Sequence, residues 1–418
     1  MLMAGFDIVI FSIYFILLFL SIFWLTVLYT VKDSKKPILK GEPYFTVLVP
    51  AYNEEGTILK TLKSLVELDY PENKKQIIVI NDGSKDKTQE VIEKFIKNHP
   101  LEDITLLNQE NQGKGSALNN GLKYTKGKFY ACLDADSSVE KNAIKEMLPY
   151  FEDREVAAVC PLLKIEKPTT VIEKVQWYEY VVNMFYKYLN AKINCIHVTP
   201  GPFSVYRTQL IKDLGGYDTT TITEDLEIAI RLQKHQYKIV QTFDATVYTK
   251  APKTWKGLFK QRVRWYKGSV DNSISYRDMI FNKKYGDFGV IRMPTIILSG
   301  ILTIILTLFL LRHLLTRLVK DLIWMIQIKF DVIPLIKNIK LDFDILLLPF
   351  SKIFIACFLI SIGLFVMFYS YRVIGEKITN HGKTFVSLIV YLLMYSLFLS
   401  TVWLYIAFIF ISGKQAKW

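Results

Sequence analysis

Four long apolar runs without a charged residue constrain the fold of this 418-residue chain more than any other feature. Each run is long enough to cross the roughly 30 Å hydrocarbon core of a bilayer as a helix. The polar residues gather mainly between the first two runs, so the 51% hydrophobic and 22% charged residues are segregated along the chain. The sequence therefore predicts about four membrane-spanning helices beside one polar domain. The runs are Ile8–Val31, Met293–Leu311, Ile353–Tyr371 and Phe385–Ile411.

A signal peptide and buried core helices are the alternatives for these runs. The first run lacks the basic start and the small-residue cleavage site of a signal peptide, and it is too long for one. Lys32, Lys35, Lys36 and Lys40 follow it, and such a basic flank marks the cytosolic side of a membrane. We therefore expect a multi-pass protein of the plasma membrane with residues 32–289 in the cytosol. With four spans, residues 312–349 would be external despite their basic residues, and part of them could form an interfacial helix.

The net charge of +13 is compatible with two kinds of partner. Nucleic-acid binding is one reading, but no nucleic-acid module is recognisable, so we expect no such partner. Attraction to anionic lipid headgroups and to a diphosphate substrate is the simpler reading. The cysteines form no C-x-x-C pair, which favours small buried side chains over disulfides or metal ligands. They are Cys132, Cys160, Cys195 and Cys357.

Short β-rich runs alternate with helical patterns after the basic linker. This alternation predicts an α/β domain with a mostly parallel sheet and helices on both faces. Ligands of such sheets bind at the carboxyl ends of the strands, which is where we look for chemistry. The expected strands are Phe45–Pro50, Gln76–Asn81, Ile104–Asn108 and Lys128–Asp134, and the expected helices are Thr57–Glu67, Lys87–Asn98 and Gly115–Lys123.

Polar residues follow the first two strands. Tyr52 and Glu54 come after the first and could hold a base and a ribose, or simply begin the next helix. Asp82 ends the second, where it could accept a hydrogen bond from a uracil N–H. The alternative is that Asp82, Ser84 or Asp86 caps the following helix. We prefer the cap for Ser84 and Asp86 and the ligand role for Asp82.

Lys114 and two aspartates come next. Lys114 stands between two glycines at a helix start, where it can meet a diphosphate, although the P-loop pattern is not fulfilled. Asp134 and Asp136 are two residues apart, so both carboxylates can face one ligand from an extended segment. Two such carboxylates repel each other unless a cation lies between them. Mg²⁺ or Mn²⁺ shared with a nucleotide diphosphate fits this arrangement.

Glu224 and Asp225 open a predicted helix over Leu226–Gln233. They could be an acidic cluster favoured by the helix dipole, or supply a general base that deprotonates an acceptor hydroxyl. Further along, Gln261 precedes Arg264 by three residues and Trp265 by four, so the three share one helix face. This face suits a sugar stacked on the indole beside a diphosphate, and an interfacial role for part of the helix is compatible with it.

The ordered motifs resemble the signature of family 2 glycosyltransferases, above all its processive membrane branch of cellulose, hyaluronan and poly-N-acetylglucosamine synthases. The likeness covers about Lys40–Ser269. It implies a GT-A-type nucleotide-sugar-binding fold. The motifs are Asn81-Asp82-Gly83-Ser84, Asp134-Ala135-Asp136, Thr223-Glu224-Asp225 and Gln261-Arg262-Val263-Arg264-Trp265.

The resemblance also implies a role for each matching residue. Asp82 would bind uracil, Asp134 the diphosphate and Asp136 the metal, with Asp225 as the base. Gln261, Arg264 and Trp265 would frame the acceptor end and the diphosphate. The layout of one leading and three trailing spans most resembles that of the poly-N-acetylglucosamine synthases. Cellulose and hyaluronan synthases usually carry more spans, so this chain could need a partner subunit or self-association to complete a channel. The implied parts are residues 1–39 (first span and linker), 40–250 (catalytic domain), 251–289 (interface helix) and 290–418 (membrane region).

We therefore expect an inverting, processive transfer of N-acetylglucosamine or glucose from a UDP-sugar to a β-linked polysaccharide. A non-processive enzyme that glycosylates a lipid is the nearest rival, and a catalytically inactive scaffold or channel is a remote one. Val171–Asn190 is expected to be an amphipathic helix in the membrane interface, with some of its aromatic residues in the core. Pro200–Ser204 departs from the glycine-rich acceptor loop of relatives, which puts the acceptor's identity in question.

Overall fold

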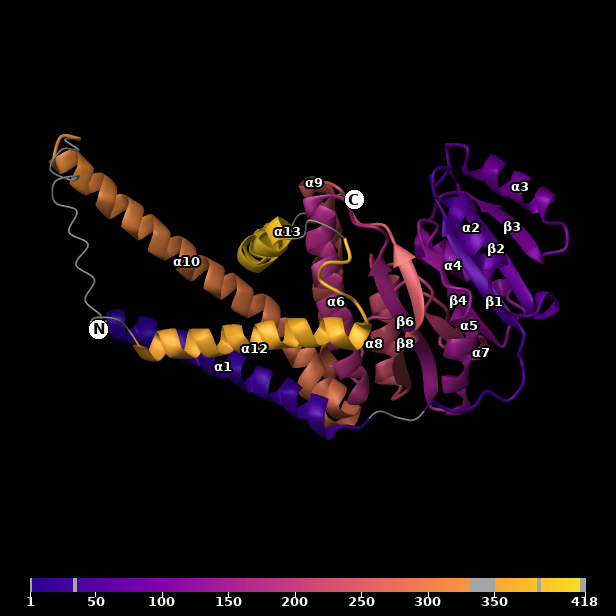
Figure 1. Ribbon diagram of the computed structural model, residues 1–418, viewed down its shortest axis with the longest axis horizontal. Coiled ribbons are helices and arrows are strands. Elements are labelled where there is room, and N and C mark those ends of the chain that lie inside the picture. The colour runs from indigo at the N-terminus through magenta and orange to yellow at the C-terminus, as the bar shows by residue number, and fades with distance from the viewer. Residues whose placement is uncertain (1, 33–35, 331–349, 382–384, 414–418) are drawn as a thin grey trace.

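The computed structural model describes residues 2–32, 36–330, 350–381 and 385–413. An α/β domain occupies one end of the molecule, and long helices extend from it at the other end (Figure 1). Helix α6 (Val171–Lys192) stands between these two parts.

One eight-stranded sheet forms the α/β domain, in the order β3-β2-β1-β4-β7-β6-β8-β5. The first four strands of this order are parallel, whereas β7 pairs antiparallel with both of its neighbours. β6 and β8 are parallel, and β5 is antiparallel to β8. The sheet is thus parallel in its first half, as the sequence predicts, and mixed in its second. The strands are β1 (Phe45–Ala51), β2 (Lys75–Asp82), β3 (Ile104–Gln109), β4 (Phe129–Cys132), β5 (Ser138–Val139), β6 (Val156–Ile165), β7 (Val205–Arg207) and β8 (Lys238–Thr249).

Helices cover both faces of the sheet because successive strand residues point to opposite sides. In β2, Ile77 and Val79 join one buried apolar cluster, and Ile78 and Ile80 join the other. Helices α2 (Ile58–Val66), α3 (Thr88–Asn98), α5 (Ala143–Met147) and α6 contribute to the first cluster. Helices α4 (Lys114–Lys123), α7 (Thr208–Asp213) and α8 (Glu224–Lys234) contribute to the second.

Helix α6 corrects one expectation. A helix does begin at Val171, where Thr170 and Glu173 form a capping box. Its rings, however, do not face lipid: Trp177, Tyr178 and Phe185 are at most 1% exposed. The Trp177 ring lies 5.4 Å from that of Tyr371 in the third span. Most of the aromatic residues of α6 are therefore core, between the sheet and the membrane helices.

Among the described residues, four helical segments are long and apolar enough to span a membrane: Ile10–Thr30, Phe288–Gln327, Phe350–Ile374 and Phe385–Ser412. They correspond to the four apolar runs of the sequence. They comprise α1 (Leu2–Thr30), α10 (Met293–Gln327) after a π-helical turn, α12 (Phe350–Ile374), and α13 (Phe385–Ile389) joined to α14 (Tyr395–Ser412) by a second π-helical turn.

Helix α10 differs from the prediction at its end. It continues without a break to Gln327, so residues 312–327 belong to the same helix as the second apolar run and do not form a separate helix. The rest of the expected external segment, residues 331–349, lies outside the described residues.

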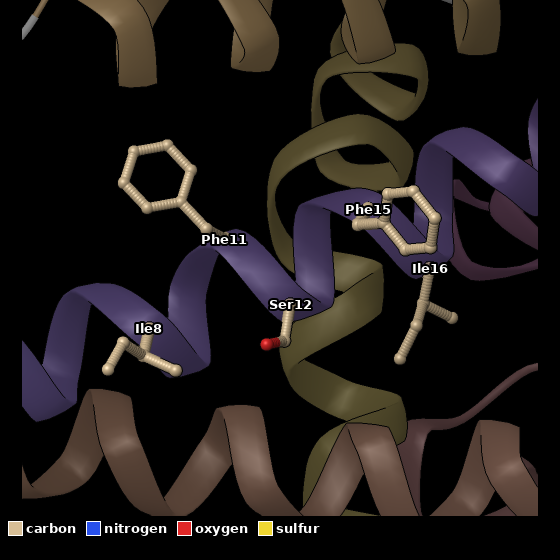
Figure 2. Close-up of a pocket in the computed structure, with 5 residues that line it drawn as sticks. All are labelled: Ile8, Phe11, Ser12, Phe15 and Ile16. Atoms are coloured by element: carbon tan, nitrogen blue, oxygen red, sulfur yellow. The ribbon is translucent and has the colours of Figure 1, made fainter.

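An open hollow of about 590 Å³ lies along the amino-terminal half of α1 (Figure 2). Its lining contains no charged side chain, and it lies on the membrane helices, away from the sheet (Figure 1). A nucleotide diphosphate needs charged or polar partners, so the catalytic site has to be sought at the sheet. The lining residues are Ile8, Phe11, Ser12, Phe15 and Ile16.

Candidate active site at the carboxyl ends of the strands

Asp134 and Asp136 lie in a turn just beyond β4. The sequence predicts a strand up to Asp134, but β4 ends at Cys132. The turn is fixed from α2, where the Thr61 hydroxyl lies 2.8 Å from the Ala135 carbonyl oxygen and 2.7 Å from that of Ser137. The two carboxylates are therefore held by a braced turn and not by an extended strand.

Lys114, the first residue of α4, joins this turn to α8. Its Nζ lies 2.6 Å from Asp134 Oδ1 and 3.0 Å from Glu224 Oε1. Burial disfavours the ammonium charge, but Asp134, Glu224 and Asp225 outweigh it and raise the pKa of Lys114 well above its usual value. The lysine expected to meet a diphosphate is thus held here by two carboxylates.

Gly201 explains how the Pro200–Ser204 loop can approach this ion pair. A Cβ atom at Gly201 would lie 2.6 Å from Lys114 Nζ and 3.1 Å from Asp134 Oδ2. The loop is tied to α8 as well, because Thr199 donates its N–H and its hydroxyl to the Asp225 carbonyl oxygen, at 3.2 and 2.9 Å. The loop therefore forms one wall of the carboxylate cluster.

Asp136 has the properties of a cation ligand. Burial first, and then the charge of Asp134, raise the pKa of its carboxyl to about 6, and Glu54 adds to the effect. Its Oδ1 accepts a hydrogen bond from the Ser137 hydroxyl, at 3.0 Å. Within the described ranges, no cluster of three or more acidic, His or Cys residues could hold a metal. A cation held by Asp136 and Asp134 would need its remaining ligands from a bound diphosphate, and its binding here stays a prediction.

Glu224 and Asp225 begin α8, and the pKa values of their carboxyls are shifted in opposite directions. Burial favours the neutral form of Glu224, but attraction and a hydrogen bond from Lys114 outweigh it and lower its pKa. Burial, followed by the Glu224 charge, raises the pKa of Asp225 to about 6. A carboxyl with this pKa is a stronger proton acceptor than an ordinary aspartate and is still ionised at neutral pH.

Helix α9 (Trp255–Ser275) packs directly against the start of α8. A Cβ atom at Gly268 would lie 2.3 Å from the Thr223 hydroxyl oxygen, so the two backbones approach closely. Asn272 Nδ2 donates to the same oxygen at 3.2 Å. Thr223 thereby fixes the distance between α9 and the pair Glu224–Asp225.

The face of α9 predicted to meet the acceptor lies beside these carboxylates. Arg264 is exposed, and its charge lowers the pKa of both Glu224 and Asp225. Trp265 is partly buried, with the Arg262 guanidinium 4.1 Å from its ring centroid. Gln261 Oε1 accepts a hydrogen bond from Arg262 Nη1 at 2.9 Å. The three predicted residues are thus on one helix, and Arg262 contacts two of them.

Asp82 has a structural task that the sequence did not reveal. Its carboxylate accepts from Gln109 Nε2 at 2.8 Å and from the backbone N–H groups of Gln112 and Gly113 at 3.0 and 2.9 Å. It therefore holds the loop that leads to Lys114. Tyr52 is 43% exposed at the end of β1, and the predicted binding of uracil by Asp82 stays a prediction.

The two predicted caps of α3 have different outcomes. Asp86 Oδ1 accepts from the backbone N–H of Thr88, the first helical residue, at 3.0 Å, as expected. Ser84 was wrongly assigned as a cap, because its hydroxyl accepts from the Asn53 N–H at 3.0 Å and so ties the ends of β1 and β2 together.

Comparison with known proteins identifies the family. The glycosyl transferase family 2 model matches residues 46–215, and the glycosyl transferase family group 2 model matches residues 131–412. The chain is 34% identical over 263 residues to the poly-β-1,6-N-acetyl-D-glucosamine synthase of Staphylococcus epidermidis, covering 60% of this chain and 63% of that protein. For the synthase of Staphylococcus aureus strain MSSA476 the identity is 33% over 278 residues, covering 64% and 66%.

The fold also has a solved counterpart. A mannosyltransferase from Pyrobaculum calidifontis, solved with GDP-mannose and Mn²⁺, superimposes with a TM-score of 0.58 at 22% identity, over 69% of this chain and 79% of that one. This likeness supports the GT-A-like fold alone. The second family model, in contrast, covers more than half of the residues, from within the sheet to the last membrane helix. The chain therefore belongs to glycosyl transferase family group 2.

Proposed function

We propose that this protein is a processive, inverting glycosyltransferase that extends a β-linked polysaccharide from a UDP-sugar. In this reaction the hydroxyl at the end of the acceptor attacks the anomeric carbon, its proton passes to a base, and the bond to UDP breaks. The sugar is N-acetylglucosamine or glucose. The names of the staphylococcal relatives favour N-acetylglucosamine.

The observation that carries the proposal is the position of Asp225. This carboxyl, with a pKa raised to about 6, is close enough to Lys114 and to the exposed Arg264 for both positive charges to act on its pKa. Asp225 takes the proton of the acceptor hydroxyl, and Arg264 offsets negative charge that develops on the diphosphate. A base and a cation on either side of one reacting centre are what a direct displacement needs.

The donor side consists of the residues at the ends of β1, β2 and β4. We infer that Tyr52, Glu54 and Asp82 receive the nucleoside and that Asp134 with Lys114 receives the diphosphate. Asp136 and Asp134 would hold Mg²⁺ or Mn²⁺, which supplies positive charge to the leaving diphosphate. Burial first, and then the charge of Asp134, raise the carboxyl pKa of Asp136; a bound cation would offset both effects, which supports a cation there.

The acceptor side is continuous with the membrane part. Helix α9 carries Gln261 and Trp265 on the same face as Arg264, whose charge acts on Asp225, and it packs against α14 through Val263 and Val402. We propose that the terminal sugar of the product stacks on Trp265 and that the chain then passes toward the membrane helices. In this arrangement residues 40–250 form the catalytic domain on the cytosolic face of the plasma membrane, with 251–289 at the interface.

A pulse and chase in vesicles containing the purified protein tests the proposal. After a pulse of labelled UDP-N-acetylglucosamine and an unlabelled chase, we expect the label in progressively longer chains. Trp265→Ala should give shorter products while UDP still binds, because stacking on an aromatic ring contributes on the order of 1 kcal/mol. A wild-type product that stays a singly glycosylated lipid would instead identify the non-processive enzyme.

A further inference from the structure

Arg262 is a fully buried arginine in the centre of the acceptor helix. Its exposed fraction is 0%, although its neighbours Gln261 and Arg264 reach the surface at least in part. A buried guanidinium is expensive unless its donors and its charge are satisfied. The partners of Arg262 therefore indicate the role of this side chain.

Two of the partners of Arg262 lie on two other helices. Arg262 Nη2 forms an ion pair with Glu179 of α6, and Arg262 Nε donates to the Tyr395 hydroxyl of α14 at 3.2 Å. The same hydroxyl donates to Glu179 Oε2 at 2.7 Å, which closes a ring of three side chains. Helix α9 is thus attached to the catalytic domain through α6 and to the membrane through α14.

The remaining contacts of Arg262 point toward the acceptor face. Its Nη1 donates to Gln261 Oε1 at 2.9 Å, and its planar face lies over Trp265, 4.1 Å from the ring centroid. A guanidinium can serve four partners in fixed directions, whereas an ammonium group has neither the fork nor the flat face. One side chain therefore determines how both predicted acceptor residues are oriented.

Tyr395 is placed by an irregularity of the last membrane helix. It follows directly after the π-helical turn Val390–Met394, which adds a residue to the helical repeat and changes the direction of the side chains beyond it. Tyr395 is 4% exposed and stacks 5.8 Å from the ring of Phe398. Helix α14 thus places the Tyr395 hydroxyl within hydrogen-bond distance of Arg262 and Glu179.

We propose that Arg262, Glu179 and Tyr395 form a positioning unit that sets Gln261 and Trp265 for the acceptor and couples them to helix α14. The proposal rests on the function proposed above. Arg262 is a positioning residue here and not a catalytic one, because it acts through Gln261 and Trp265. Loss of the unit should weaken handling of the acceptor and leave donor binding intact.

Two variants separate positioning from stability. Arg262→Lys keeps a charge beside Glu179 and removes the fork and the stacked face. The double variant Glu179→Leu with Arg262→Met removes both charges, and such replacements of buried ion pairs often preserve stability. Lys267→Met is the matched control, since Lys267 lies on the same helix in an ion pair with Asp271 and contacts none of the three residues.

Three readouts apply to the detergent-purified full chain: hydrolysis of UDP-N-acetylglucosamine by water, the KM for a β-1,6-linked N-acetylglucosamine pentasaccharide, and hydrogen exchange of residues 255–275. We expect both variants to hydrolyse the donor at the wild-type rate. The KM for the pentasaccharide should rise about tenfold, which corresponds to the loss of one good polar contact. Hydrogen exchange of residues 255–275 should become faster. Lys267→Met should match the wild type.

Two outcomes would overturn the positioning unit. One is a wild-type pentasaccharide KM in both variants, and the other is a matching loss of donor hydrolysis, which would place Arg262 in the chemistry itself. A wild type that adds only one sugar would refute processive synthesis, but the KM and the exchange rates would still decide the role of Arg262.

Discussion

Two adjacent carboxylates, Glu224 and Asp225, are given different properties by their surroundings. Glu224 is held in its charged form by Lys114, 3.0 Å away. Asp225 is half-buried, and partial burial followed by the Glu224 charge raises its pKa to about 6. A buried group next to a fixed negative charge is a better proton acceptor. At this scale the sequence supplies two acids, and the fold gives their carboxyls different pKa values.

Replacement of the base tests this assignment directly. Asp225→Asn should lower sugar transfer by roughly 10²–10⁴-fold, the typical contribution of a general base, while UDP affinity stays within a few-fold. Turnover assays and calorimetric titration with UDP measure the two effects. Transfer at the wild-type rate in this variant would refute the role of Asp225.

The raised pKa of Asp225 also predicts a pH dependence. Below about pH 6 the carboxyl is protonated and cannot accept the acceptor's proton, so kcat/KM should fall roughly tenfold for each further pH unit. Above that value it should level off. The residual activity of Asp225→Asn should lack this acidic limb, and a limb that persists there would have to belong to another group.

At the scale of elements, the site depends on how closely α8 and α9 approach each other. Gly268 allows this contact because even a Cβ atom would meet the side chain of Thr223. The sequence predicts both helices from their patterns, but it does not reveal that Gly268 and Thr223 touch. Such contacts between distant residues are set by packing, which no local pattern encodes.

Gly268→Ala should therefore lower transfer. Within a helix this change usually adds about 1 kcal/mol of stability. Here, however, the added methyl group would push Thr223 and the first turn of α8, which carries Asp225, away from α9. Gly363→Ala in α12 is the matched control, because a Cβ atom there meets nothing within 4 Å. Equal transfer rates in the two variants, measured with protein of comparable thermal stability, would contradict this prediction.

Helix α6 and Arg262 show where sequence reasoning reaches its limit. The bounds predicted for β1 to β4 and for α2 to α4 agree with the observed bounds to within two residues. The rings of α6 were partly assigned to lipid because a protein core and a bilayer are both apolar. The sequence predicts a role for Arg264 and none for Arg262, because two arginines in one motif give no sign of which one is buried.

The whole molecule places a polar domain at one end of a set of apolar helices. Helix α10 alone has 35 residues, about 52 Å at 1.5 Å per residue, and exceeds the roughly 30 Å hydrocarbon core. The most apolar windows of the four spans are only 6–17% buried within the protein. Most of their surface is thus left for lipid or for other chains to cover.

The proposed cytosolic orientation can be tested at a single exposed site. Leu101, 87% exposed between α3 and β3, can be changed to Cys in a background that replaces the exposed native Cys357 with Ser. A membrane-impermeant maleimide should label this Cys in inside-out vesicles and not in intact cells. Labelling in intact cells would place the catalytic domain outside.

The ammonium of Lys114 can serve only some of the anions around it at once. In the structure it is shared by Asp134 and Glu224. A bound diphosphate would compete for Lys114 and release Asp134 to a cation, so donor and cation should bind cooperatively. Each must then strengthen the other by the same factor. Titrations of UDP with and without Mn²⁺ should show this linkage in the wild type, and Lys114→Met should largely abolish it.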